Sequence, residues 1–113
     1  MDENVKSQTE AWREAMAEQL VKHHLHFDHA FAKTRSELCT ELNVNDRELR
    51  RIIEVARCKG ALICNDCDGY GYYLGIERSD VVKQYKREKA RMIKHWNAMR
   101  PFYEKMKEWG LEP

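Results

Sequence analysis

Long apolar runs are missing from this sequence of 113 residues, and that absence excludes a membrane-spanning helix. No stretch approaches the roughly 18–20 consecutive apolar residues that a bilayer requires, and 35% of the side chains are charged. The first ten residues, MDENVKSQTE, are acidic and polar, so they resemble neither a secretory signal nor a transit peptide. We therefore expect a soluble, cytoplasmic protein.

A strong net charge is also missing, because 20 lysines and arginines face 19 aspartates and glutamates. The neutral total does not by itself indicate a nucleic-acid partner. The charges are nevertheless uneven: residues 1–20 hold five acids and two bases, a net charge of −3, and residues 83–94 hold six bases and one acid, a net charge of +5. Such asymmetry bears on the choice of partner more than the sum does.

Motifs of common catalytic and cofactor sites are missing as well. The chain has no glycine-rich phosphate loop and no nucleophile elbow, so we expect neither enzyme activity nor a cofactor. Cys64 and Cys67 have the spacing of half a zinc knuckle. The other two cysteines, Cys39 and Cys58, are far apart and lie in predicted helices. We therefore predict no bound metal and reduced thiols, with a Cys64–Cys67 zinc site as the alternative.

Four histidines lie between residues 23 and 29. His23 and His26 could share one helical face, and a metal site formed by the two is one interpretation. No glutamate completes an HExxH arrangement, and such clusters are more often partly exposed packing. We expect these histidines, and His95 near the C-terminus, to be structural.

The N-terminal segment, residues 9–33, has a helical pattern at its start. An apolar stripe predicts a helix over residues 10–24 that Thr9 would cap. Residues 25–33 are ambiguous, although Phe27 and Phe31 lie four apart and could extend the helix. The members of the apolar stripe are Trp12, Met16 and Leu20.

Two shorter helices follow. Thr34 with a glutamate three residues later matches a capping box and predicts a short helix, which Asn43 breaks. Asn45, again with a glutamate three residues later, predicts a second helix over residues 46–59. Gly60 ends that helix because glycine accepts a positive φ. The expected buried side chains of the two helices are Leu38, Leu42, Leu49, Ile52, Ile53 and Ala56.

A hairpin and a long helix complete the chain. The strand pattern ALIC at residues 61–64 and the aromatic run YGYYL at residues 70–74 flank an Asp-Gly turn, which predicts a β-hairpin. Ser79 is placed to cap a last helix over residues 79–110. We expect Pro101 to kink or divide this helix, because its ring removes an amide donor and clashes with the preceding turn.

The order of short helix, tight turn, helix, glycine and hairpin resembles a winged helix-turn-helix domain. The resemblance covers residues 34–75 and begins with TRSELCTELNVNDRELRRII. This segment is similar to the N-terminal domains of biotin-operon repressors and to small phage or prophage proteins of Gram-positive bacteria. Asn43 stands where this family usually has glycine, but asparagine tolerates the left-handed conformation. The resemblance implies an α+β fold with a two-stranded wing. The length of the chain predicts a single domain, residues 1–113, which the long C-terminal helix completes.

By this resemblance the helix over residues 46–59 is the recognition helix of a non-catalytic DNA-binding protein, a small transcription regulator or a phage accessory factor. Arginines on such a helix read guanine edges in the major groove and bind phosphates. The expected recognition residues are Arg47, Arg50 and Arg51. Additional phosphate contacts are expected from Lys33, Arg35, Lys83 and Arg87.

The wing departs from the DNA-binding pattern. Its tip carries Asp66 and Asp68 and no basic residue, and carboxylates repel phosphates. An alternative therefore stays open, in which the chain is a protein-interaction module that docks on a host nucleoprotein complex. The acidic wing would bind together with Tyr70, Tyr72 and Tyr73.

The last helix has a heptad seam, in which spacings of three and four residues alternate. One winged domain needs about half of this helix to cover its core. The remainder requires a partner, which is either the acidic helix over residues 10–24 or a second copy of the chain; a homodimer would present two recognition helices. The seam consists of Val82, Tyr85, Lys89, Met92, Trp96, Met99, Tyr103 and Met106.

Overall fold

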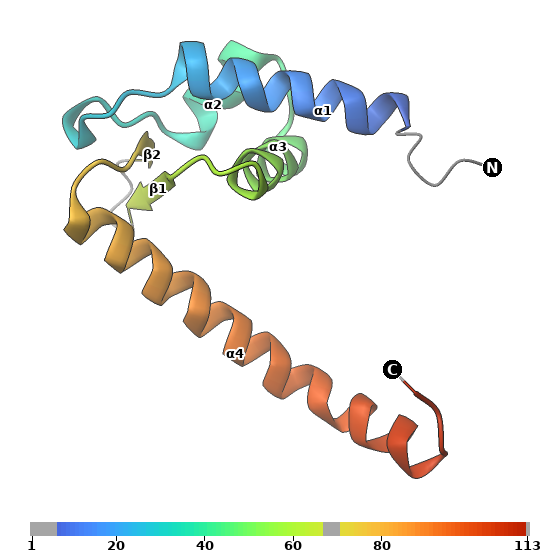
Figure 1. Cartoon of the computed structure of the whole chain (residues 1–113). Coiled ribbons are helices and arrows are strands. Elements are labelled where there is room, and N and C mark those ends of the chain that lie inside the picture. Colours follow the sequence, from blue (N-terminus) through green and yellow to red (C-terminus); the bar gives the residue numbers. More distant parts are fainter. Residues whose placement is uncertain (1–6, 67–70, 113) are drawn as a thin grey trace. The chain divides into compact units, whose positions relative to one another are not determined.

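The computed structural model describes residues 7–66 and 71–112 (Figure 1). The chain is α+β and mostly helical, as the sequence predicts. It divides into two compact units, one ending at Val81 and the other beginning at Val82, and each is described by itself. The elements are α1 (Gln8–Gln19), the π turn η1 (Leu20–His24), the 3₁₀ turn η2 (His29–Phe31), α2 (Arg35–Leu42), α3 (Asp46–Cys58), β1 (Ile63–Asp66), β2 (Gly71–Leu74) and α4 (Arg78–Glu108).

Helix α1 begins two residues earlier than the sequence predicts. Ser7, and not Thr9, is the N-cap, because the Ser7 hydroxyl accepts a hydrogen bond from the amide of Glu10 at 3.1 Å. The helix ends in the π turn η1, where the amide of Leu25 donates to the carbonyl of Leu20 at 3.1 Å. This wider turn ends with both Leu20 and Leu25 buried.

The segment after η1 does not continue the helix, so the extension suggested by Phe27 and Phe31 is wrong. Leu25 is extended, and the Asp28 carboxylate caps a separate 3₁₀ turn by accepting from the amide of Ala30 at 2.9 Å. Both phenylalanines are exposed. A short aspartate side chain that binds the local backbone favours such a turn over a helix.

The caps of α2 and α3 confirm the sequence analysis. Thr34 Oγ1 accepts from the amide of Glu37 at 3.2 Å, and Asn45 Oδ1 accepts from the amide of Glu48 at 2.8 Å. Between the helices, Asn43 is left-handed with φ 54° and ψ 51°.

Two antiparallel strands form the predicted hairpin, with Ile63 opposite Leu74. Strand β1 starts at Ile63, two residues later than the apolar run suggests. Lys33 extends the pairing through an isolated antiparallel bridge to Tyr72, with amide–carbonyl distances of 3.0 and 2.7 Å. The Asp-Gly turn at residues 68–69 lies outside the described residues.

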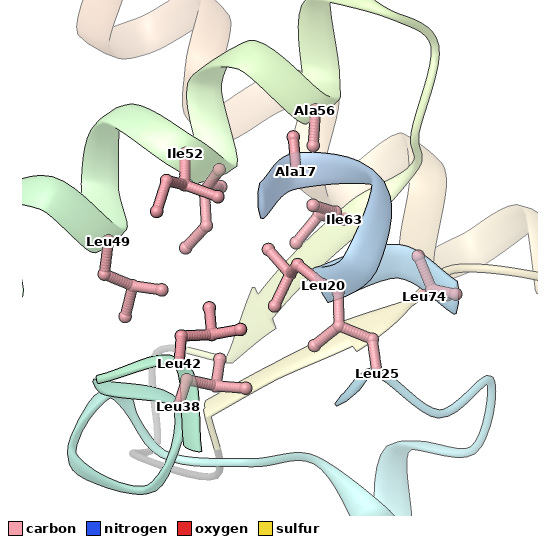
Figure 2. Packing of buried hydrophobic residues seen from close by; sticks show 11 residues of the cluster. Ala17, Leu20, Leu25, Leu38, Leu42, Leu49, Ile52, Ala56, Ile63 and Leu74 are labelled. Carbon is pink, nitrogen blue, oxygen red and sulfur yellow. The ribbon is translucent and has the colours of Figure 1, made fainter. Parts of the chain in front are cut away.

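One apolar core fills the first unit, and Figure 2 shows its side chains converging from every element of that unit except η2. In the described residues no polar or charged side chain is buried. Helix α3 packs against α1, α2 and β1, so one side of this helix is fixed by the core. The fully buried side chains are Leu20, Leu38, Leu49, Ile52 and Ile63.

Helix α4 begins at Arg78, so Ser79 lies inside the helix and the predicted Ser79 cap is wrong. It continues through Pro101 as one element. None of its side chains is buried, and its large apolar residues include Phe102 at 74% exposure. Over the described part of the chain, no helix combines the length and the apolar character needed to cross a membrane.

Candidate nucleic-acid interface

The outer face of α3 carries the three arginines that the sequence singled out. Arg47, Arg50 and Arg51 are all exposed, because the opposite face of the helix supplies Leu49 and Ile52 to the core. Within residues 7–66 and 71–112, neither Arg47 nor Arg51 forms a hydrogen bond or an ion pair. Their guanidinium groups are therefore available to an anion from solution.

Asp46 brings two further basic groups together at the N-terminus of α3. Arg50 Nη2 lies 3.2 Å from Asp46 Oδ2, and Arg35 Nη1 lies 3.5 Å from the same oxygen. The three side chains are between 49% and 64% exposed. Ion pairs at this exposure are weak, so a phosphate can replace the carboxylate as the partner of either arginine.

Lys33 is placed differently from Arg35, although both were predicted to contact phosphate. The Lys33 ammonium lies 2.7 Å from Glu41 Oε1, and its side chain is only 20% exposed. Glu41 also pairs with His24 Nδ1 at 2.7 Å. The hydrogen bonds from Lys33 and then His24 lower the pKa of Glu41. Lys33 therefore links β2, through its backbone bridge, to α2 and η1.

Lys83 and Arg87 belong to the second unit. They lie one turn apart on α4, where Lys83 is exposed and Arg87 is partly buried. With Arg91 and Lys94 they continue as a basic stripe at spacings of four, four and three residues. Their contribution to DNA binding stays a prediction.

A bidentate ion pair holds α3 against α1. Arg13 Nε and Nη2 donate to the two carboxylate oxygens of Glu48 at 2.5 and 3.2 Å, and both side chains are about one-fifth exposed. The hydrogen bond from Arg13 is the main cause of the lowered pKa of Glu48, with smaller Coulombic contributions that include Arg51 and Arg47. Sequence patterns do not indicate this pair, because 35 residues separate its partners.

Arg57 fixes the other end of α3. Its guanidinium donates twice to the carbonyl of Ile63, at 3.0 and 2.8 Å, and once to Asn65 Oδ1 at 3.3 Å. Helix α3 is thereby held to neighbouring elements at its first turn by Glu48 and at its last turn by Arg57. A basic residue in the last turn of a helix is a signal that could have indicated this role, because such residues often bind carbonyl groups.

The tyrosines of the alternative interface are partly unavailable. Tyr73 is buried, its hydroxyl donates to Asp80 Oδ1 at 2.9 Å, and its ring meets the edge of His29. Tyr72 packs against the core. Tyr73 is therefore not accessible to a partner in this structure, and docking through the rest of the wing stays a prediction. Tyr70 and Asp68 lie outside the described residues, and Asp66 is described only as a residue of β1.

The cysteine and histidine clusters do not assemble in the described region. Cys64 is buried beside main-chain carbonyls, and Cys67 lies outside the described residues. His23 and His26 do not share a helical face, because η1 ends at His24; the His26 ring instead makes a tilted contact with the Phe31 ring. Among the residues the structure describes, no group of three or more His, Cys, Asp or Glu could hold a metal ion.

Comparison with protein-family models, with curated proteins and with solved structures finds no match to this chain.

Proposed function

We propose that this chain is a non-catalytic DNA-binding protein, a small regulator or a phage accessory factor, in which α3 is the recognition helix. The observation that carries the proposal is the outer face of α3. Within the described residues, Arg47 and Arg51 are exposed there without a hydrogen bond or an ion pair, on a helix whose opposite face is buried.

The element order of the first unit supports this interpretation. Helix α1 is followed by the bridging residue Lys33, then α2, α3 and the hairpin β1–β2. A left-handed residue, Asn43, separates α2 from α3. This order corresponds to the winged helix-turn-helix domain that the sequence resembles. Helix α3 has 13 residues, about 20 Å in length, which is suitable for insertion in a major groove.

The outer face of α3 that carries Arg47, Arg50 and Arg51, here called the arginine face, is positive although the unit around it has a negative net charge. Residues 1–81 hold eleven basic and fifteen acidic side chains, a net charge of −4, whereas residues 82–113 hold nine basic and four acidic side chains, a net charge of +5. A negative unit approaches DNA favourably only through its positive face. The wing tip repels phosphate, so we expect contact through α3, with Arg35 beside it and the basic side chains of α4 as further contributors.

Fluorescence anisotropy with a labelled duplex pool tests the proposal. The full chain should bind with an affinity that falls steeply as salt rises from about 50 to 200 mM, because phosphate contacts release counterions. The triple variant R47A/R50A/R51A should bind at least about tenfold more weakly, with a smaller salt slope. Sites selected from the pool then show whether the three arginines read bases or only phosphates.

A matched control separates the recognition face from total charge. The variant K22A/K59A/R78A removes the same three charges from exposed positions outside the face and should retain most of the affinity. Circular dichroism should show that both triple variants keep the helical content of the parent. Equal losses in the two variants, or no DNA binding at low salt, would overturn the proposal.

A further inference from the structure

The seam of α4 lies on a helix that is long, exposed and free of buried side chains. Along the eight seam residues, spacings of three and four alternate from Val82 to Met106 without interruption. Tyr85 is 61% exposed and Met92 is 63% exposed. Apolar residues that repeat every 3.5 positions over three to four heptads are typical of helices that wrap around another helix.

Helix α1, the other candidate partner, has used most of its apolar side. Ala17 is buried in the core of the first unit and Met16 packs against that core, which leaves Trp12 as its one large exposed apolar side chain, at 43% exposure. Helix α1 has 12 residues, about 18 Å, whereas the seam from Val82 to Met106 covers about 37 Å. A partner that matches the seam along its whole length is a second α4.

The spacing of the seam allows a complete antiparallel match. When two copies of α4 run in opposite directions with Lys94 at the centre, every seam residue faces a seam residue of the partner. Val82 then faces the partner's Met106, Tyr85 faces the partner's Tyr103, Lys89 faces the partner's Met99, and Met92 faces the partner's Trp96.

Charge favours this direction over the parallel one. In a parallel pair each residue faces its own copy, so Lys89 would be buried against the partner's Lys89. Residues 78–94 carry seven bases and two acids, a net charge of +5, and residues 95–112 carry three of each. Parallel pairing places the two +5 halves side by side, whereas antiparallel pairing places each +5 half beside a neutral half.

The position of Lys89 also fits. Its Nζ atom lies 5.9 Å from the centre of the Tyr85 ring, so the aliphatic part of the side chain can cover the seam while the ammonium stays at its edge. Trp96 and Tyr103 are in ring contact at 5.6 Å. Trp96 and Tyr103 therefore form one continuous aromatic patch on the seam.

We propose that α4 is a homodimerisation helix that pairs with α4 of a second copy in an antiparallel coiled coil centred on Lys94. This inference is independent of DNA binding. If both hold, each dimer carries two copies of the α3 arginine face.

Light scattering on the full chain across a range of concentrations tests the pairing. The expected particle at high concentration has twice the 13.5 kDa of one chain. The variant M92E/M99E places two carboxylates in the seam and should yield monomers. Its control, A90E/N97E, adds the same charges at the same spacing outside the seam and should remain dimeric. A particle of 13.5 kDa at every concentration would overturn the proposal.

Disulfide trapping tests the direction without weakening the helix. In a background with C58S and C67S, V82C and M106C are made in separate chains, one of which is tagged. Antiparallel pairing should link V82C to M106C in mixed samples, whereas V82C alone should stay unlinked because its two copies are about 36 Å apart. Efficient linkage of V82C to itself would overturn the antiparallel arrangement.

A third variant tests the role of Lys89. K89L removes the break in the seam and should lower the dissociation constant of the dimer at least about tenfold, because two apolar side chains become buried. An unchanged or higher constant would contradict the placement of Lys89 in the interface. The cysteine pairs and K89L retain an apolar or unchanged seam, so a folding defect in M92E/M99E does not decide the outcome.

Discussion

At Gly71 the main chain passes too close to Lys33 for any side chain. A Cβ atom on Gly71 would lie 1.9 Å from the carbonyl oxygen of Lys33, and the residue has φ +89°. Gly60 also has a positive φ, +102°, but a Cβ there would meet nothing within 4 Å. A side chain at Gly60 would therefore cause backbone strain alone, whereas a side chain at Gly71 would cause both backbone strain and a steric clash.

We predict that Gly71→Ala destabilises the first unit more than Gly60→Ala does. The Gly60 variant should lose about 1–2 kcal/mol, the usual cost of a left-handed residue with a side chain. The Gly71 variant adds a clash with the backbone and should also separate Lys33 from Tyr72. Urea unfolding of both variants gives the comparison. Equal losses would show that the bridge between Lys33 and Tyr72 yields without cost.

At the scale of the elements, the contact between α1 and α3 includes one ion pair whose strength depends on the protonation of a carboxylate. Arg13 lowers the pKa of Glu48 from its ordinary value of 4.5. A carboxylate whose pKa is lower in the folded state stabilises the fold above its unfolded pKa, and this stabilisation disappears as pH falls through the folded value. The pair should therefore stabilise the packing of α1 on α3 at neutral pH, and this contribution should be lost in acid while the apolar contacts remain.

We predict that Glu48→Gln lowers the melting temperature at pH 7 and flattens its decline between about pH 5 and pH 2, because the glutamine has no proton to gain. Thermal unfolding followed by circular dichroism across this range measures the effect. Glu54→Gln, an exposed change on the same helix, is the control and should keep the slope of the parent. An identical slope in the Glu48 variant would contradict the role of the pair.

The elements that sequence patterns predicted are those with local causes. The caps at Thr34 and Asn45 each need only a backbone amide three residues away, and Gly60 needs only its own conformational freedom. A pattern of adjacent residues contains this information. The predicted Ser79 cap failed because serine is also tolerated within the first turn of a helix, where α4 places it.

The features that the sequence did not reveal depend on distant partners. The region 25–33 is shaped by the Asp28 cap and by the bridge from Lys33 to Tyr72, and neither is visible in apolar spacing. In the candidate site, helical periodicity alone placed Arg47 and Arg51 on the outer face. The sharing of Asp46 by Arg35 and Arg50 required the turn between α2 and α3, which periodicity does not describe.

At the scale of the whole molecule, the chain combines a unit with its own core and a helix without one. The first unit buries apolar side chains from four of its helices and turns, namely α1, η1, α2 and α3, and from both strands. Helix α4 buries none of its own. An isolated helix is marginal in water unless its apolar face is covered, so the two units should differ in how their stability responds to protein concentration.

We predict two unfolding transitions in the full chain. The transition of α4 should move to lower temperature by several degrees on a hundredfold dilution, because it depends on pairing, whereas the transition of the first unit should not move. Circular dichroism at 222 nm at several concentrations resolves the two. M92E/M99E should abolish the concentration-dependent transition and leave the other in place. A single transition whose temperature does not depend on protein concentration would contradict the separate unfolding of the two units.

Pro101 gives the second unit a property that its uniform helical ribbon does not suggest. The backbone nitrogen of Pro101 carries no hydrogen, so the carbonyl of Asn97 lacks the amide donor that would normally close this turn of the helix. Solvent can hydrate that oxygen directly. Helix α4 should consequently bend most easily near Pro101, about two turns before its C-terminal end.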